Sequence, residues 1–262
     1  MKLFDSHAHY NDHRYGEEYP GGMEGAINDA FSAGVCGFVC VGTEPENCRK
    51  AIEIAEKYEK GFAAVGLHPE DANMFPREKI PAIIDDIASL LSHPKVVALG
   101  EIGLDYHWDT PKDLQKEVFE MQLCIAEKNG VPVIIHDREA HGDIFDILRA
   151  HPDVTGVMHC YSGSAEMAKD YVRRGWYISF AGPVSYKNAE NVRNACRAVP
   201  IDRILIETDC PYLTPVPHRG KINHSGYMAY TLAAMAAARG EDEETLAKAT
   251  IENSMRLFGI EL

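Results

Sequence analysis

The sequence has 262 residues, of which 45% are hydrophobic and 25% are charged, a composition typical of a globular protein with a large core. Its net charge of −14 argues against a broad basic surface for long duplex nucleic acid, but allows a nucleic-acid substrate held locally by metal ions and a few Arg or Lys. Seven cysteines form no Cys-x-x-Cys pair, no apolar signal segment precedes Asp5, and no apolar run reaches the roughly 20 residues of a membrane span, so we expect a cytoplasmic protein with reduced thiols.

Short β-rich runs alternate with longer stretches of helical periodicity along the whole sequence. Most of these runs are nearly continuous in apolar residues, which is typical of parallel strands with helices on one side and a core on the other. The eight predicted strands cover residues 2–5, 37–41, 62–65, 96–99, 132–135, 155–158, 176–179 and 203–206.

Helices are predicted between these strands. Segments 46–58 and 112–129 carry apolar stripes at helical spacing, and Gly130 follows the second segment at a position where helices commonly end. No linker or repeat divides the sequence, so we expect one domain over residues 1–262. Eight strand–helix units predict a closed (β/α)8 TIM barrel, with an open doubly wound sheet as the competing arrangement. Residues 242–258 predict an extra C-terminal helix.

Histidines and carboxylates recur where the predicted strands end. In chain order they are His7 and His9 after the first strand, Glu101 after the fourth, His136 after the fifth, His159 after the sixth and Asp209 after the eighth. Barrel enzymes build their active sites at the carboxyl ends of the strands. We therefore expect these groups to converge at one mouth of the barrel.

Taken singly, each of these residues has a less specific explanation. His7 and His9 are two apart and point to one face of a strand, but they could be exposed polar residues. His136 and His159 follow apolar runs and could be core histidines bonded to backbone carbonyls. Glu101 could cap a helix or form a salt bridge, although a buried carboxylate is costly without a cation. Their coincidence at matching strand ends favours metal ligands.

Four histidines and two carboxylates form a ligand set that suits Zn²⁺, Mn²⁺ or a similar ion. Two such ions could share one carboxylate, lower the pKa of water and hold the attacking and leaving oxygens of a hydrolysed ester. The sequence has no Gly-x-Ser-x-Gly nucleophile motif, and residues 100–103 lack the spacing of a dinucleotide-binding loop. The residues thus predict a metal-dependent hydrolase.

Several segments, in order along essentially the whole chain, match the pattern of one family. They are Phe4-Asp5-Ser6-His7-Ala8-His9, Gly66-Leu67-His68-Pro69, Gly100-Glu101-Ile102-Gly103-Leu104-Asp105-Tyr106, Gln115, Val133-Ile134-Ile135-His136-Asp137-Arg138-Glu139-Ala140, His159-Cys160-Tyr161-Ser162-Gly163, Glu207-Thr208-Asp209-Cys210-Pro211-Tyr212-Leu213, Pro217-His218-Arg219-Gly220-Lys221 and residues 253–258. The sequence resembles the TatD family of metal-dependent deoxyribonucleases, a branch of the amidohydrolase-like barrels.

The resemblance implies a binuclear centre with two divalent metal ions, of Zn, Mg or Mn. Glu101 would bridge the ions, and Asp209 would ligate the first ion and take the proton from the attacking water. His7 and His9 would hold the first ion. His136 and His159 would hold the second ion or lie close to it.

The resemblance also implies residues that bind the substrate. The candidates to bind the substrate phosphate are His68, Arg138 and Arg219. The guanidinium geometry of the two arginines suits a phosphate, although Arg219 could be a solvated loop charge. Tyr161 and Trp108 could stack on a base, or simply pack at the rim.

One segment departs from the family pattern. After Lys221 the family usually reads Arg-Asn-Glu-Pro, whereas this sequence reads Ile222-Asn223-His224-Ser225. The change removes an Arg and a carboxylate near the predicted mouth and leaves the predicted metal ligands intact.

The implied function is hydrolysis of phosphodiester bonds in DNA by an exonuclease that trims single-stranded or 3′ ends, with no membrane and no obligate protein partner. One alternative is the hydrolysis of a small amide, lactone or phosphoester on the same metal centre. Another is a binding or scaffold protein that keeps an inactive site, against which the complete set of six ligands argues.

Overall fold

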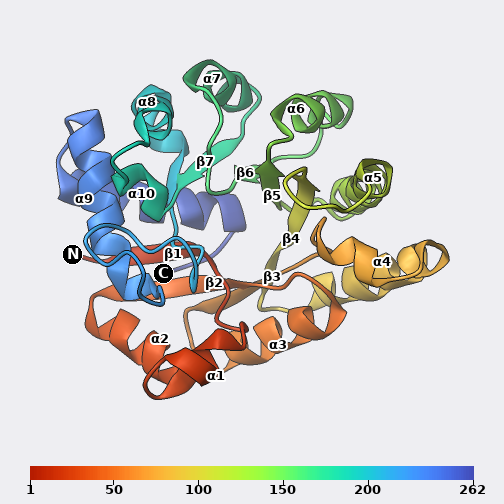
Figure 1. Cartoon of the computed structure of the whole chain (residues 1–262), viewed down its shortest axis with the longest axis horizontal. Coiled ribbons are helices and arrows are strands. Elements are labelled where there is room, and N and C mark those ends of the chain that lie inside the picture. Colours follow the sequence, from red (N-terminus) through yellow and green to blue (C-terminus); the bar gives the residue numbers. More distant parts are fainter.

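Eight parallel strands form one sheet in the order β1-β2-β3-β4-β5-β6-β7-β8 in the computed structural model, which describes residues 1–262 (Figure 1). The strands are β1 (Leu3–Ala8), β2 (Val35–Val41), β3 (Gly61–Val65), β4 (Val96–Asp105), β5 (Val133–Arg138), β6 (Gly156–Met158), β7 (Tyr177–Phe180) and β8 (Ile204–Ile206). Each strand pairs with the next along the chain, which is the order of a (β/α) barrel.

Helices surround the ring of strands (Figure 1). They are α1 (Arg14–Glu18), α2 (Gly22–Ser32), α3 (Pro45–Glu56), α4 (Ile80–Ser89), α5 (Lys112–Asn129), α6 (His141–Ala150), α7 (Ala165–Arg173), α8 (Glu190–Ala198), α9 (Met228–Arg239) and α10 (Glu243–Phe258). None of them combines the length and the apolar composition that a bilayer-spanning helix needs.

The first and last strands meet and close the sheet. Ala8 forms a parallel bridge with Cys210, and the backbone N–H of His9 donates to the Cys210 carbonyl at 2.7 Å. The Ser6 hydroxyl donates to the carbonyl of Ile206 at 2.9 Å. The predicted (β/α)8 barrel is thereby confirmed over an open sheet.

The helix α10 adds to the barrel at its N-terminal side. Leu257, Phe258 and Ile260 pack with the side chains that fill the barrel interior, among them Phe4. The Asn253 amide donates to the carbonyls that flank the start of β8. The predicted C-terminal helix is confirmed, and Asp242 caps it by accepting a hydrogen bond from the N–H of Thr245.

Three strands run beyond their predicted ends. β1 continues to Ala8, β4 to Asp105 and β5 to Arg138, whereas the predictions ended them at residues 5, 99 and 135. The reason is that the polar residues read as the start of a loop remain in the parallel ladder, as the pairing of Gly103 with His136 shows, and those of β1 and β4 are buried as well. The strand ends thus form a rigid support for the polar groups at the mouth.

Candidate metal centre and active site

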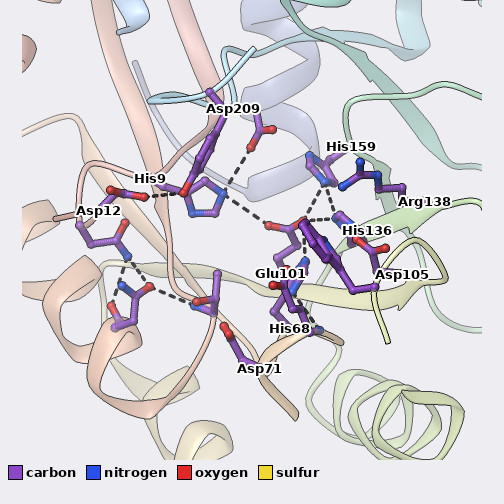
Figure 2. A pocket seen from close by; sticks show the side chains of 16 residues that line it. His9, Asp12, His68, Asp71, Glu101, Asp105, His136, Arg138, His159 and Asp209 are labelled. Carbon is purple, nitrogen blue, oxygen red and sulfur yellow. Dashed lines mark hydrogen bonds and ion pairs between the residues drawn. The ribbon is translucent and has the colours of Figure 1, made fainter. Parts of the chain in front are cut away.

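A polar pocket of about 540 Å³ opens at the carboxyl ends of the strands. Two of its sixteen lining residues are hydrophobic, and the others can donate or accept hydrogen bonds or bind a cation. The lining comprises His9, Asn11, Asp12, Thr43, Asn47, His68, Glu70, Asp71, Glu101, Asp105, Trp108, His136, Arg138, His159, Asp209 and Tyr212 (Figure 2).

Glu101 lies at the centre of the histidines, and its two carboxylate oxygens face different pairs. Oε2 lies 3.2 Å from Nε2 of His7 and 3.5 Å from Nε2 of His9. Oε1 lies 2.6 Å from Nδ1 of His136 and 2.8 Å from Nε2 of His159. Figure 2 shows His9 on one side of Glu101, and His136 and His159 on the other. A carboxylate in this position can bridge two cations.

Asp209 completes the group on the Oε2 side. Its Oδ1 lies 3.3 Å from Nε2 of His9 and 3.6 Å from Nε2 of His7. The chain brings it there through a left-handed backbone at Asp209 (φ 55°), and its N–H donates to the carbonyl of His7 at 3.0 Å. His7, His9 and Asp209 together form one of the groups whose ligand atoms are close enough to hold an ion.

Neighbouring groups orient three of the histidines. Nδ1 of His9 lies 3.0 Å from the carbonyl of Val41, which can only accept, so Nδ1 is the donor of this hydrogen bond and Nε2 faces the cluster. In the same way Asp105 Oδ2 lies 2.9 Å from Nε2 of His136. Such partners on the far nitrogen are the usual support of a metal-binding histidine.

His159 is oriented by Glu207, which is buried at the end of β8. Glu207 Oε1 lies 3.3 Å from Nδ1 of His159 and accepts a hydrogen bond from the N–H of Cys160 at 2.7 Å. Ser179 donates its hydroxyl to the other oxygen of Glu207. These two hydrogen bonds hold the Glu207 carboxylate in place beside His159. Nδ1 of His7, by contrast, is buried without a partner.

The electrostatics of the cluster favour positive charge between the side chains. Burial alone would lower the pKa of His9, but hydrogen bonds to Asp209 and Glu101 raise it to about 10. Burial would likewise lower the pKa of His136, but hydrogen bonds to Asp105 and Glu101 raise it to about 9. Burial would raise the pKa of Asp209 and Glu101, but the histidines outweigh it and lower both. The carboxylates are therefore ionised, and the Nε2 atoms of His7 and His9 converge to 3.0 Å. A divalent cation fits this donor set.

Two other candidates from the sequence lie at the same pocket. Nε2 of His68 is 3.5 Å from Oε1 of Glu101, so His68 stands beside the same oxygen as His136. The Arg138 guanidinium lies 5.8 Å from the centre of the Trp108 ring, and 49% of Trp108 is exposed. These positions suit contact with a bound substrate.

Tyr161 and Arg219 are not brought to the pocket lining. Tyr161 is buried, its ring packs edge-on against Tyr171, and its hydroxyl donates to the carbonyl of Ser164 at 2.9 Å. Arg219 lies on an exposed loop with its guanidinium 4.2 Å from the centre of the Tyr186 ring. The left-handed backbone at Cys160 (φ 42°) turns the chain after β6 toward the helices.

The segment that departs from the family pattern, residues 222–225, forms hydrogen bonds with β1 and with the chain after β8. The Ser225 hydroxyl donates to Asp5 Oδ2 at 2.6 Å and lies 2.6 Å from the Tyr10 hydroxyl. Asn223 donates to the carbonyls of Thr208 at 3.2 Å and Tyr212 at 2.6 Å. Neither Ser225 nor Asn223 lines the pocket, so the segment positions the ends of β1 and β8.

Asp105, Glu207 and Asp5 are carboxylates that support the site and that the sequence analysis quoted within motifs but did not single out. Each is a buried carboxylate that follows or interrupts an apolar strand. That pattern, a charge inside a strand, was the available signal, because an interior carboxylate needs a partner.

The comparisons with known proteins agree with this geometry. Residues 4–259 match the family model described as TatD related DNase. The chain belongs to the TatD family. The TatD resemblance of the sequence is confirmed by relatives that match nearly end to end.

The uncharacterized metal-dependent hydrolase YabD of Bacillus subtilis (strain 168) is 43% identical over 261 residues, which cover 98% of this chain and 99% of YabD. The 3′-5′ ssDNA/RNA exonuclease TatD of Enterobacter lignolyticus is 32% identical over 246 residues, 90% of this chain and 93% of that protein. Among solved structures, YJJV, a TatD homolog from Escherichia coli K12, superposes with a TM-score of 0.90 at 29% identity and covers 99% of this chain and 98% of its own.

Proposed function

We propose that residues 1–262 form one catalytic barrel, a metal-dependent exonuclease that hydrolyses phosphodiester bonds at the 3′ ends of single-stranded DNA. The observation that carries the proposal is the position of Glu101, whose two carboxylate oxygens face two separate pairs of histidines. Membership of the TatD family and the names of the relatives support the nuclease activity. All seven cysteines are free thiols, which supports a reducing, cytoplasmic location.

The proposed cofactor is a pair of divalent ions, of Zn, Mg or Mn, and Glu101 would hold both. Asp209 would complete the first ion site, whose histidines are His7 and His9. His136 and His159 would hold the second ion. When bound, ions of this kind supply an activated water and neutralise charge on a reacting phosphate.

The side chains of the pocket have distinct proposed roles in the reaction. The Asp209 carboxylate is 17% exposed against 4% for Glu101, so it is the ligand placed to accept a proton from the attacking water. Its lowered pKa keeps it ionised for that purpose. Arg138 and His68 would bind phosphate oxygens, and the exposed ring of Trp108 would stack on a base.

The test is a nuclease assay with metal-stripped protein and 5′-labelled single-stranded DNA, to which Mg²⁺, Mn²⁺ or Zn²⁺ is returned separately. Asp209→Asn is measured beside Asp202→Asn, a control in an exposed carboxylate. We expect a ladder of products that requires metal, persists in the control and falls at least about 10³-fold with Asp209→Asn, as for loss of a group that both binds the ion and takes the proton. DNA left intact with every metal, or full activity of Asp209→Asn, would overturn the proposal.

A further inference from the structure

The pocket is asymmetric in charge. Its lining contains a single Arg or Lys, Arg138, which is the last residue of β5. Trp108, whose ring lies beside the Arg138 guanidinium, is in the loop after β4. The loops after β1 and β3 contribute three carboxylates, Asp12, Glu70 and Asp71, and none of them pairs with an Arg or Lys. Figure 2 shows Asp12 and Asp71 on the side of Glu101 away from Arg138, and Asp12 Oδ2 accepts a hydrogen bond from the Tyr212 hydroxyl at 2.7 Å.

Two cations on the carboxylate side, Lys50 and Arg14, have partners of their own. The Lys50 ammonium donates to the carbonyl of Asn11 at 2.6 Å, behind the pocket wall. Arg14 binds Glu18 at 2.9 Å, and its guanidinium lies 5.3 Å from the centre of the Tyr212 ring at the edge of the pocket. Neither cation is part of the lining and neither forms an ion pair with the three carboxylates, although Arg14 is near enough to offset part of the charge of Asp12.

Neutral groups between the carboxylates form a fixed wall. Asn11 donates to the side-chain oxygen of Asn47 at 2.7 Å and to the carbonyl of Val41 at 2.9 Å. The N–H of Thr43 donates to the same Asn47 oxygen at 3.1 Å. These bonds hold short polar side chains in place, so that no long cationic side chain reaches this part of the pocket.

We infer that the side of the pocket formed by the loops after β1, β2 and β3 holds the terminal nucleoside with a free 3′-hydroxyl and rejects a 3′-terminal phosphate. The strand then leaves past Arg138 and Trp108. The inference rests on the proposed nuclease function and adds the chemical identity of the end that the site accepts. Asp12 and Asp71 are the groups that discriminate between the two ends.

The physical reason is the opposite response of the two ends to carboxylates. A hydroxyl donates a charge-assisted hydrogen bond to a carboxylate. A terminal phosphate monoester has no hydroxyl to donate when fully ionised and carries about −1.5 to −2 charges at pH 7, so it is repelled by Asp12 and Asp71. Selectivity of this kind comes from a penalty on the wrong end as much as from a contact with the right one.

The wild-type, metal-loaded enzyme is the first test, with two 5′-labelled strands of one sequence that end in a 3′-hydroxyl or a 3′-phosphate. We expect kcat/KM to be at least about tenfold higher for the hydroxyl end, which corresponds to a modest like-charge penalty. Equal rates on both ends would overturn the inference and leave the nuclease function standing. Failure to cut the hydroxyl-ended strand would overturn both.

The variants Asp12→Asn and Asp71→Asn, singly and together, identify the groups responsible, and Asp202→Asn is the matched surface control. The ratio of kcat/KM between the two ends is the readout, so a general loss of activity does not affect it. We expect the ratio to fall stepwise toward one in the single and double variants and to stay at the wild-type value in the control. A ratio unchanged in the double variant would overturn the assignment to these carboxylates.

The direction of the strand is tested with Arg138→Ala on a dinucleotide, which has only the scissile phosphate, and on a trinucleotide, which adds one upstream phosphate. If the strand leaves past Arg138, the variant loses more kcat/KM on the trinucleotide than on the dinucleotide. An equal loss on both would contradict that exit.

Discussion

The replacement Asp105→Asn tests whether His136 is held as a metal ligand. Asp105 Oδ2 is 2.9 Å from Nε2 of His136, while its Oδ1 accepts the N–H of His107 at 2.9 Å. Gln115 bonds both the N–H and the carbonyl of Asp105 at 2.7 Å, so the backbone stays in place in the variant. Asparagine has nearly the same shape, but it removes the charge and keeps one acceptor oxygen, so with that oxygen toward His136 the N–H of His107 loses its acceptor.

The expected magnitude follows from the role of that charge. A carboxylate on the far nitrogen raises the basicity of a histidine, and its loss typically weakens metal binding about 10- to 100-fold, which is about 1.4–2.8 kcal/mol. Because the asparagine carbonyl can still accept the bond from His136, we expect a loss toward the lower end, about tenfold. Only the ion beside His136 is affected, since the other group of ligands does not touch Asp105.

The assay is a titration of metal-stripped protein with Mn²⁺ or Zn²⁺ in competition with a chromophoric chelator. Asp137→Asn is the control, because Asp137 Oδ2 makes a similar 2.8 Å contact with Nδ1 of His141, a histidine outside the cluster. The reasoning predicts one weakened ion in Asp105→Asn and two unchanged ions in Asp137→Asn. Wild-type affinity for both ions in Asp105→Asn, or an equal loss in both variants, would refute it.

Three further predictions concern stability. Returning an ion to stripped protein at 100 times its Kd should stabilise the fold by about 2.7 kcal/mol, seen as a higher Tm; an unchanged Tm would mean that no ion binds the folded state. Gly103→Ala should cost at least about 2 kcal/mol in chemical denaturation, because Gly103 has φ 144° and a Cβ would overlap the carbonyl of His136; a cost below 0.5 kcal/mol, roughly that of an ordinary surface change, would contradict this. Asn253→Ala removes bonds of 2.8 Å to the carbonyls of Ile201 and Ile204 and should cost about 2–4 kcal/mol by the same measurement, whereas a near-neutral result would show that α10 is held by apolar packing alone.

The barrel and the convergence of ligands could be predicted because both depend on regular periodicity. His7 and His9 are two apart on a strand, so they had to share a face, and their Nε2 atoms meet at 3.0 Å. Glu101, His136 and Asp209 follow apolar runs, and parallel strands of a barrel deliver such positions to one mouth. The strand boundaries at β1, β4 and β5 were wrong because polarity was read as the end of a strand.

The contacts that depend on loops could not be predicted in the same way. Tyr161 follows His159 closely in sequence, but the left-handed backbone at Cys160 sends its ring to the helices instead of the pocket. The partners of the histidines, Asp105 and Glu207, depend on which neighbouring strand end lies beside each ring. Sequence periodicity carries no information about such cross-strand distances.

The central claim is that the site binds two ions and that Glu101 contacts both. It is tested most directly by anomalous scattering from crystals grown with Mn²⁺. The account predicts two anomalous peaks, one beside His7, His9 and Asp209 and the other beside His136 and His159, with Glu101 between them. A single peak, or peaks that do not contact Glu101, would contradict it.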